Sequence, residues 1–371
     1  MLLVDIVGYA SCGLATTQWR SHRVPTTNTS PPVEPDWIPD EADFPARGSV
    51  EDAITFCLRY AVLAASGHNS QPWWFKVDDT AVTVGLDVSR GLAVADPLDR
   101  EATISVGAAI MTLRIALAHF GLQARVDDWP DPKDPEACAT VTVTSGASTD
   151  ETLEPLFGQI TQRRSSHAGF DDTPVDDAVL AELAGEAAAE GAALHSFTTA
   201  DDRQALAELV AEADQEQMSD LRFRRELASW LRRPFSRQRD GLHGYTVGSP
   251  LEEVALTSPL IVRTFDVGKQ RGAHNIDLVG ASPVIAILST AADDRSAWLD
   301  AGRAIARTHL RASRAGLSVG FLNQAIEVPA TRAKVGEIIG AGAVPQILLR
   351  LGYGPPVPAQ PRRPLERFLI D

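Results

Sequence analysis

Two distant segments of this chain carry glycines at the same spacing, and this spacing constrains the fold more than any other feature. Gly107-Ala108-Ala109-Ile110 leads to Gly121, and Gly302-Arg303-Ala304-Ile305 leads to Gly316, with equal glycine-to-glycine separation. A glycine near the start of a helix can simply allow close helix packing. Equal spacing at such a distance also indicates duplication of a whole domain. We therefore expect two similar halves that pack through the long helices starting near Gly107 and Gly302.

The elements of the first half are predicted from the periodicity of its apolar residues. Ser49 and Asp52 form an approximate capping box for a helix that ends near Ala65. A strand from Pro72 to Val77 and a second from Ala81 to Val88 follow. The next helix covers about Ile104 to Phe120, with Gly121 as its stop. These elements leave a polar loop between the first helix and the first strand.

The later chain repeats this order with a long addition. A helix is predicted from Asp176 to Glu190 and a strand from Ala192 to Phe197, and about 73 extra residues separate this strand from the long helix. The addition contains seven arginines between Asp220 and Asp240 and a glycine-rich stretch, 241–245. It is either a solvated basic helix or an inserted lid, at about 215–275, over a ligand site. The predicted domains are an N-terminal arm (1–48), half 1 (49–150) and half 2 (151–371).

Composition narrows the class of protein and the compartment. The net charge of -15 disfavours nucleic acid or an anionic membrane as a partner. Three widely spaced cysteines support neither a disulfide framework nor a thiolate metal site, so we expect a reducing cytoplasm. The apolar run at residues 2–7 is interrupted by Asp5 and lacks a basic start, which disfavours a secretory signal. No stretch approaches the roughly 20 apolar residues that span a bilayer.

The polar loop is the most chemically dense stretch of the chain. From Ser66 to Trp73 it contains two hydroxyls, a glycine, an imidazole, two carboxamides and an indole. Such a loop can exchange hydrogen bonds in both directions with a flat heteroaromatic ring. Trp73 and Trp74 can equally be core aromatics, and strand alternation directs them to opposite faces.

A second polar cluster opens the second half. Arg163, Arg164, Ser165 and His167 suit a phosphate, because guanidinium groups bind phosphate oxygens bidentately. A double arginine alone is common on protein surfaces. Together with the 66–73 loop, however, it provides a phosphate-binding end and a ring-binding end, which is what FMN requires.

These motifs resemble those of the nitroreductase family over about residues 50–368. The loop S-x-x-N-x-Q-P-W resembles the family's flavin loop. The segment Arg163–His167, together with Phe170, resembles the family's phosphate segment, and Pro361–Leu365 resembles its C-terminal arginine segment. Ala95–Glu101 and the two halves resemble the Acg-like branch. Ala65 stands where the family usually has proline, and His167 where it usually has arginine.

The resemblance implies an α+β, three-layer nitroreductase-like fold, in which two fused halves form a pseudo-dimer and a monomer holds one FMN between them. It also implies that Ser318–Leu322 directs backbone amides toward the flavin, with Gly320 permitting close approach. The expected FMN-binding residues are Ser66, Gly67, His68, Asn69, Gln71, Trp73, Arg163, Arg164, Ser165, His167, Gly320, Phe321, Arg362 and Arg363. No metal site and no catalytic side chain are expected, because the flavin carries the chemistry.

The expected activity is an FMN-dependent oxidoreductase that reduces a nitroaromatic, quinone or conjugated alkene with NAD(P)H as donor. No Rossmann-type glycine motif precedes a suitable helix, so a nicotinamide would bind transiently over the flavin. One alternative is a flavin-sequestering or storage protein with a lid-occluded FMN. A second alternative is a flavin-dependent dehydrogenase that tailors a peptide or secondary metabolite.

Overall fold

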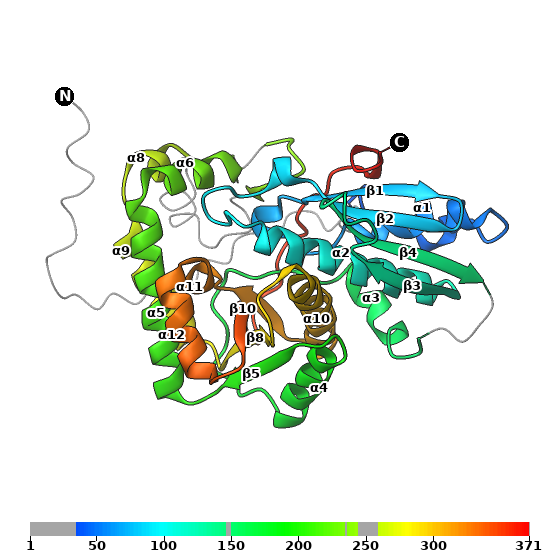
Figure 1. Ribbon diagram of the computed structural model, residues 1–371. Helices are drawn as coiled ribbons and strands as arrows, with labels where there is room; N and C mark the ends of the chain where they lie inside the picture. Colours follow the sequence, from blue (N-terminus) through cyan, green and yellow to red (C-terminus); the bar gives the residue numbers. More distant parts are fainter. Residues whose placement is uncertain (1–34, 146–149, 234–235, 244–258, 371) are drawn as a thin grey trace, which may run out of the picture. The chain divides into compact units, whose positions relative to one another are not determined.

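The structure is a computed structural model that describes residues 35–145, 150–233, 236–243 and 259–370 (Figure 1). Residues 35–371 form one unit, and residues 1–34, with Cys12 and most of the predicted arm, lie outside the described residues. Gly244 and Tyr245 of the glycine-rich stretch at 241–245 also lie outside them. The described part of the arm contains a short 3₁₀ helix, Glu41–Asp43.

Half 1 contains two helices and a four-stranded antiparallel sheet. Helix α1 (Val50–Ala61) begins at the predicted capping box, in which the Ser49 side chain and the Asp52 backbone N–H are 3.1 Å apart. Helix α2 follows the first strand pair. The elements are α1, β1 (Trp73–Asp78), β2 (Ala81–Leu86), α2 (Arg100–His119), β3 (Leu122–Asp128) and β4 (Ala137–Ser145), with strand order β1-β2-β4-β3.

Half 2 repeats this topology. Its elements are α4 (Asp177–Ala188), β5 (Ala193–Phe197), β8 (Val284–Thr290), α10 (Arg295–Arg314), β9 (Ser318–Phe321) and β10 (Val344–Gly352), and the strand order is β5-β8-β10-β9. Helices α1 and α4 both have 12 residues, and α2 and α10 both have 20. The α+β class with two fused halves is therefore confirmed.

The halves meet where α2 and α10 cross (Figure 1). A Cβ on Gly107 would lie 3.0 Å from the Cα of Gly302 and would collide with the carbonyl oxygen of Leu299. A Cβ on Gly302 would collide with the carbonyl oxygen of Ile104. Because the backbones touch, only glycine fits at either position. The paired glycines thus fix the closest approach of the halves.

The sheet of half 2, which we call sheet 2, lies between two layers of helices. Helices α1 and α2 cover one face of the sheet of half 1, which we call sheet 1. On one side of sheet 2, Leu183 of α4 and Ala301 of α10 share a core with Leu349. On the other side, Leu206 packs with Ile287 and Leu348. This second layer is formed by α5 (Ala200–Ser219), α9 (Gly268–Gly280), α11 (Gln324–Glu327) and α12 (Pro329–Ile339). A single helical turn, α3 (Phe157–Ile160), lies in the connection between the halves.

The long addition to half 2 lies between its first two strands. β1 and β2 are joined by residues 79–80, whereas β5 and β8 are joined by residues 198–283. This insertion contains α5, α9, α6 (Leu221–Trp230), β6 (Leu231–Arg232), β7 (Leu242–His243) and α8 (Pro259–Thr264). Half 1 has its own longer connection between β2 and α2, residues 87–99. Leu92 and Ala95 of this connection share a core with Phe223 and Leu227 of α6.

The C-terminal segment crosses from half 2 to half 1. After β10 it runs to the edge of sheet 1, where the Phe75 N–H donates to the Phe368 carbonyl at 2.8 Å and the Ile370 N–H donates to the Phe75 carbonyl at 2.9 Å. Phe368 is buried in the core of half 1. This crossing brings Arg362 to the end of α1.

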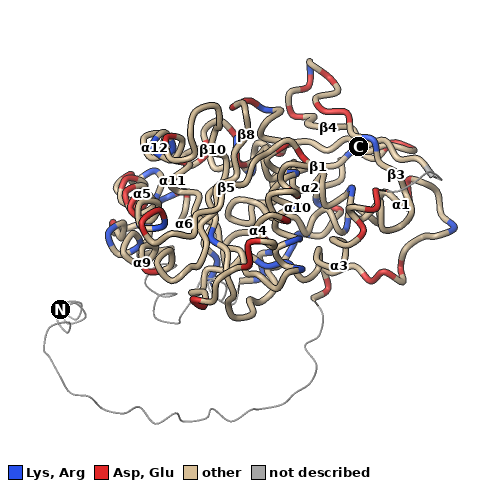
Figure 2. Tube along the Cα trace, turned by 90° about the horizontal axis from the view of Figure 1, so that it is seen from below, with Lys and Arg blue, Asp and Glu red and all other residues tan. Residues whose placement is uncertain are grey.

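Helix α2 is long and apolar enough to cross a membrane by length and composition, and 89% of its apolar window is buried inside the protein. The expectation that no segment approaches this length is wrong for α2. Most of the helix is buried because it packs against α1, α10 and sheet 1. Charge is uneven among the other helices: α5 is mainly acidic, which Figure 2 shows in red, whereas α6 carries three arginines and one glutamate.

Candidate functional site

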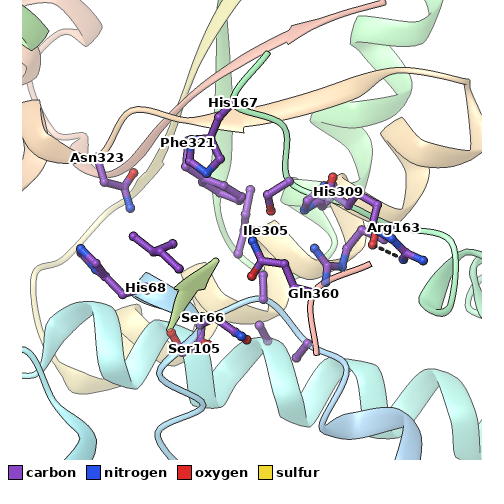
Figure 3. Close-up of a pocket in the computed structure, with 18 of the residues that line it drawn as sticks. Ser66, His68, Ser105, Arg163, His167, Ile305, His309, Phe321, Asn323 and Gln360 are labelled. Atoms are coloured by element: carbon purple, nitrogen blue, oxygen red, sulfur yellow. Dashed lines mark hydrogen bonds between the residues drawn. The ribbon is translucent and has the colours of Figure 1, made fainter. Parts of the chain in front are cut away.

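A cavity of about 340 Å³ lies between the halves, which is within the range of small-molecule sites (Figure 3). Half 1 contributes the loop after α1 and the first turns of α2, and half 2 contributes residues 160–167, α10, β9 and α11. The insertion adds Leu227, Leu231, Leu242 and part of α9, and the C-terminal segment adds residues 358–360 and Arg362. Trp37 and Ile38 of the predicted arm also line it.

The loop after α1 has an unusual backbone. His68, Asn69 and Gln71 have φ values of 51°, 52° and 53°, in the left-handed region that side chains other than glycine rarely adopt. Backbone strain of this kind persists where surrounding contacts impose it, and it is common at functional sites. Here the Gln71 N–H donates to the Ser66 hydroxyl at 3.0 Å and the Ser70 N–H donates to the Gly67 carbonyl at 2.9 Å.

Both carboxamides of this loop are used by the protein itself. Gln71 donates to the carbonyl of Arg239 at 2.8 Å and accepts from the Arg363 N–H at 2.9 Å. Asn69 donates to the Pro361 carbonyl at 3.2 Å, and its side-chain oxygen accepts from Arg362 at 3.0 Å. These bonds tie the loop to the insertion and to the C-terminal segment.

Three arginines gather at one end of the cavity. Helix α1 ends four residues before the predicted Ala65, which leaves the carbonyls of Leu63 and Ala64 free to act as acceptors. Arg163 donates to Leu63 at 3.0 Å, and Arg362 donates to Leu63 and Ala64 at 3.2 Å each. Arg164 donates to the carbonyls of Thr161 and Arg163, both at 2.8 Å. The carbonyls after α1 thus bind the guanidinium groups of Arg163 and Arg362, and Arg164 is adjacent to Arg163 in sequence.

The positive charge of this cluster is uncompensated within the described residues, because its hydrogen-bond partners there are carbonyls and a carboxamide rather than carboxylates. Burial, and then the neighbouring charge of Arg164, lower the pKa of Arg163 to about 10. Burial, followed by Arg163 and Arg164, lowers the pKa of Arg362 to about 9. The Arg362 Nε is buried and has no hydrogen-bond partner among the described residues. Such a cluster favours a bound anion.

The opposite end of the cavity is lined by imidazoles and carboxamides (Figure 3). Figure 3 shows His68 and Asn323 on the side away from Arg163, with His167 and Phe321 above Ser66. Burial, then the charge of Arg350, lowers the pKa of His167 to about 4. Burial, then the charge of Arg271, lowers the pKa of His68 to about 4. Both imidazoles are therefore neutral near pH 7.

The structure brings most of the predicted site residues to the cavity and leaves four outside its lining. Gln71 holds the loop from behind, and Trp73 is 1% exposed in the core of half 1. Gly320 lies against Arg350 and Ser166, and Arg363 stacks on Phe368 at 4.6 Å. The residues that line the cavity are Ser66, Gly67, His68, Asn69, Arg163, Arg164, Ser165, His167, Phe321 and Arg362.

Several lining residues were not foreseen from the sequence. Arg271, His274 and Asn275 come from α9, which carries no recognisable motif. Glu101, the last residue of the Ala95–Glu101 segment, lines the cavity, and so does Glu327 from α11. Glu101 and Glu327 belong to segments far apart in the sequence, so spacing alone could not predict that both line the cavity.

Among the described residues, no group of three or more His, Cys, Asp or Glu is arranged to hold a metal ion. Cys57 and Cys138 are buried free thiols, and burial raises the pKa of both.

Comparison with known proteins identifies relatives across nearly the whole chain. The Mycobacterium tuberculosis protein named "Putative NAD(P)H nitroreductase Rv3131" is 31% identical over 334 residues, which cover 88% of this chain and 92% of the relative. "Putative NAD(P)H nitroreductase acg" of the same organism is 30% identical, over 85% of this chain and 94% of the relative. No family model matches the sequence.

Solved structures give weaker likenesses. A nitroreductase with bound FMN from Bacteroides fragilis is 15% identical with a TM-score of 0.35, covering 57% of this chain and 94% of that one. A nitroreductase-like family protein from Bacillus cereus is 17% identical with a TM-score of 0.36, covering 60% of this chain and 95% of that one. Likeness at this level says nothing about the ligand of the present chain.

The near full-length match to Rv3131 shows that this chain, with its two-half α+β fold, belongs to the nitroreductase family. Within that family it falls in the branch that contains Acg.

Proposed function

We propose that the protein is an FMN-dependent oxidoreductase that binds one FMN per chain in the cavity between its halves. The observation that carries the proposal is the cluster of Arg163, Arg164 and Arg362, whose buried charges have carbonyl and carboxamide partners and leave an Arg362 N–H without one. A phosphate monoester would supply the missing charge and acceptor oxygens. The residues present therefore fit the phosphate end of FMN.

The rest of the cavity fits the other end of the same cofactor. The strained loop at Ser66, Gly67 and His68 and the side chain of Phe321 would border the ring, and Asn69 would hold the loop against Arg362. When bound, FMN supplies hydride transfer, and the protein orients the ring and controls access to it. Because backbone carbonyls at the end of α1 anchor the arginines, the ring loop and the phosphate site are positioned by the same helix end.

NAD(P)H is the proposed electron donor, by analogy with the names of the relatives, and a nitroaromatic, quinone or conjugated alkene is the proposed acceptor. Because the second half occupies the place that a second subunit would take, we propose a monomer, and the reduced cysteines favour the cytoplasm.

A second candidate, a flavin-sequestering protein, is favoured by contacts that hold the insertion against half 1. Asp240 pairs with Arg90 at 2.6 Å and with Arg232 at 2.8 Å. Glu226 accepts from the backbone N–H groups of Val94 and Ala95, both at 2.9 Å. We call these two sets of contacts the latch. A stable latch would restrict the access of a nicotinamide to the flavin.

Rapid mixing under anaerobic conditions separates the two candidates. A reductase should lose its flavin absorbance on mixing with NADPH or NADH at a rate that saturates with concentration. A sequestering protein should be bleached by dithionite and remain yellow with either nicotinamide. A protein that cannot bind FMN at all would contradict both.

A further inference from the structure

Two glutamates face the cavity at the end away from the arginines. Glu101, in the first turn of α2, is 8% exposed, and its Oε1 accepts from Arg100 at 3.0 Å and from Asn323 at 3.1 Å. Its Oε2 lies 3.6 Å from the place of a Cβ on Gly67, so it borders the predicted flavin loop. Both Glu101 and Gly67 line the cavity.

Glu327 reaches the same wall from α11. Asn323 caps this single turn, and its carbonyl accepts from the Glu327 N–H at 2.9 Å while its side chain donates to Glu101. The Glu327 Oε2 accepts from Gln217 at 2.6 Å. One asparagine therefore connects the two glutamates, and among the described residues one oxygen of each glutamate accepts no hydrogen bond.

The surroundings contain more carboxyl groups than cations. The groups that face the pair in the described part of the chain are Asp96 and Arg100 at the start of α2, Asp214 and Gln217 on α5, Arg271 on α9, Asn323 and Gln324 at α11, and His68 in the loop. Four carboxyls thus share two guanidinium groups, and Asp214 is itself paired with Arg271 at 3.5 Å. Keeping every carboxyl ionised there would leave uncompensated buried charge, which proteins avoid by retaining a proton.

The direction of the pKa shifts agrees with this count. Burial, then the charge of Glu327, raises the pKa of Glu101 well above its ordinary value. Burial raises the pKa of Glu327 to about 7, against the hydrogen bond from Gln217 and the charge of Arg100. Two interacting carboxyls of this kind titrate as one unit.

We propose that Glu101 and Glu327 share one proton near pH 7 and donate it to a carbonyl or nitro oxygen of the electron acceptor. This inference rests on the proposed function, because it needs a hydride donor of the reduced-flavin class in the same cavity. A quinone that accepts a hydride gains two electrons and one proton, and its other oxygen takes the shared proton to complete the hydroquinone. The pair is left doubly ionised and recovers a proton from solvent. The site thus selects neutral acceptors with an accessible oxygen over acceptors that carry a carboxylate.

The first test is an infrared comparison that needs no turnover. The spectrum of the wild-type holoprotein minus that of Glu101→Gln/Glu327→Gln should show the carbonyl stretch of a protonated carboxylic acid at pH 7. In each single variant this band should be lost at a lower pH than in the wild type, because the repelling partner is gone. Glu337→Gln, an exposed change on α12, should leave the band unaltered. Absence of the band from the wild type would overturn the proposal.

The second test separates the two half-reactions with 2-methyl-1,4-naphthoquinone as acceptor and dithionite to pre-reduce the flavin. The double variant should reoxidise at least about 100-fold more slowly than the wild type, which is the lower end for loss of a general acid. FMN affinity and thermal stability of the variant should be unchanged, since glutamine preserves shape and hydrogen bonding. Equal reoxidation rates would refute the proposal while leaving the FMN assignment intact. Failure to bind FMN in the wild type would instead refute the proposed function.

Discussion

Replacing Arg163 and Arg164 by alanine should remove the preference of the protein for FMN over riboflavin. The two ligands differ only in the phosphate, so their affinity ratio isolates the arginine end of the cavity. Each charge-assisted hydrogen bond contributes about 1.5–3 kcal/mol. Loss of one such bond from each of two arginines therefore corresponds to about 3–6 kcal/mol, or roughly a 10²- to 10⁴-fold weaker FMN complex.

The assay is titration of apoprotein with FMN and with riboflavin, followed by quenching of flavin fluorescence. The double variant should bind riboflavin as the wild type does, because Figure 3 shows Arg163 at the end of the cavity away from His68, and Arg164 is its neighbour in sequence. Arg125→Ala, at an exposed position on β3, is the matched control and should change neither affinity. Unchanged FMN affinity in the double variant would refute the reasoning. An equal loss for both ligands would show that the arginines shape the loop rather than bind phosphate.

Three further predictions follow from the fold, the latch and the imidazoles. Gly302→Ala should destabilise the protein by about 3 kcal/mol, at the upper end for overpacking, because the new Cβ meets the backbone of α2. Gly185→Ala on α4, with open space around it, should stabilise the protein by up to about 1 kcal/mol. Urea titrations measure both changes. Asp240→Asn should release the latch and speed flavin dissociation about tenfold or more, whereas the half-buried Asp220→Asn, outside the latch, should not. Equal rates in stopped-flow release would contradict the latch. Because the folded-state pKa of His68 is lowered to about 4, its contribution to stability is present above about pH 6.5 and is lost as pH falls toward 4. His68→Gln should flatten that part of the pH–stability curve. An unchanged slope would argue against a buried neutral imidazole.

The sequence was sufficient for the parts of the fold that local patterns encode. The capping box at Ser49, the hairpin of β1 and β2, and the paired glycines at 107 and 302 all lie where periodicity and spacing predicted them. The helix predicted from about Ile104 to Phe120 starts at Arg100, because its first turn is polar and gives no apolar stripe. The lid predicted at about 215–275 lies within the insertion of residues 198–283, whose other parts, including most of α5, gave no signal of an addition in the sequence.

The site was predictable where one segment carries several functional residues, as in the 66–73 loop and Arg163–Arg164. It was less predictable where a side chain holds a neighbouring segment in place instead of lining the cavity. Gln71 looked like a ring ligand, but its carboxamide bonds the insertion and the C-terminal segment. Arg271 and Glu327 line the cavity because of how α9 and α11 pack. No local sequence pattern predicts that packing.

The central claim, one FMN in the cavity between two fused halves, is tested most directly by the flavin content of the purified protein. The visible spectrum gives the flavin concentration, and amino-acid analysis of the same sample gives the chain concentration. We predict a yellow protein with a ratio of one FMN per chain. A ratio of two, or a colourless protein that FMN fails to reconstitute, would contradict the account.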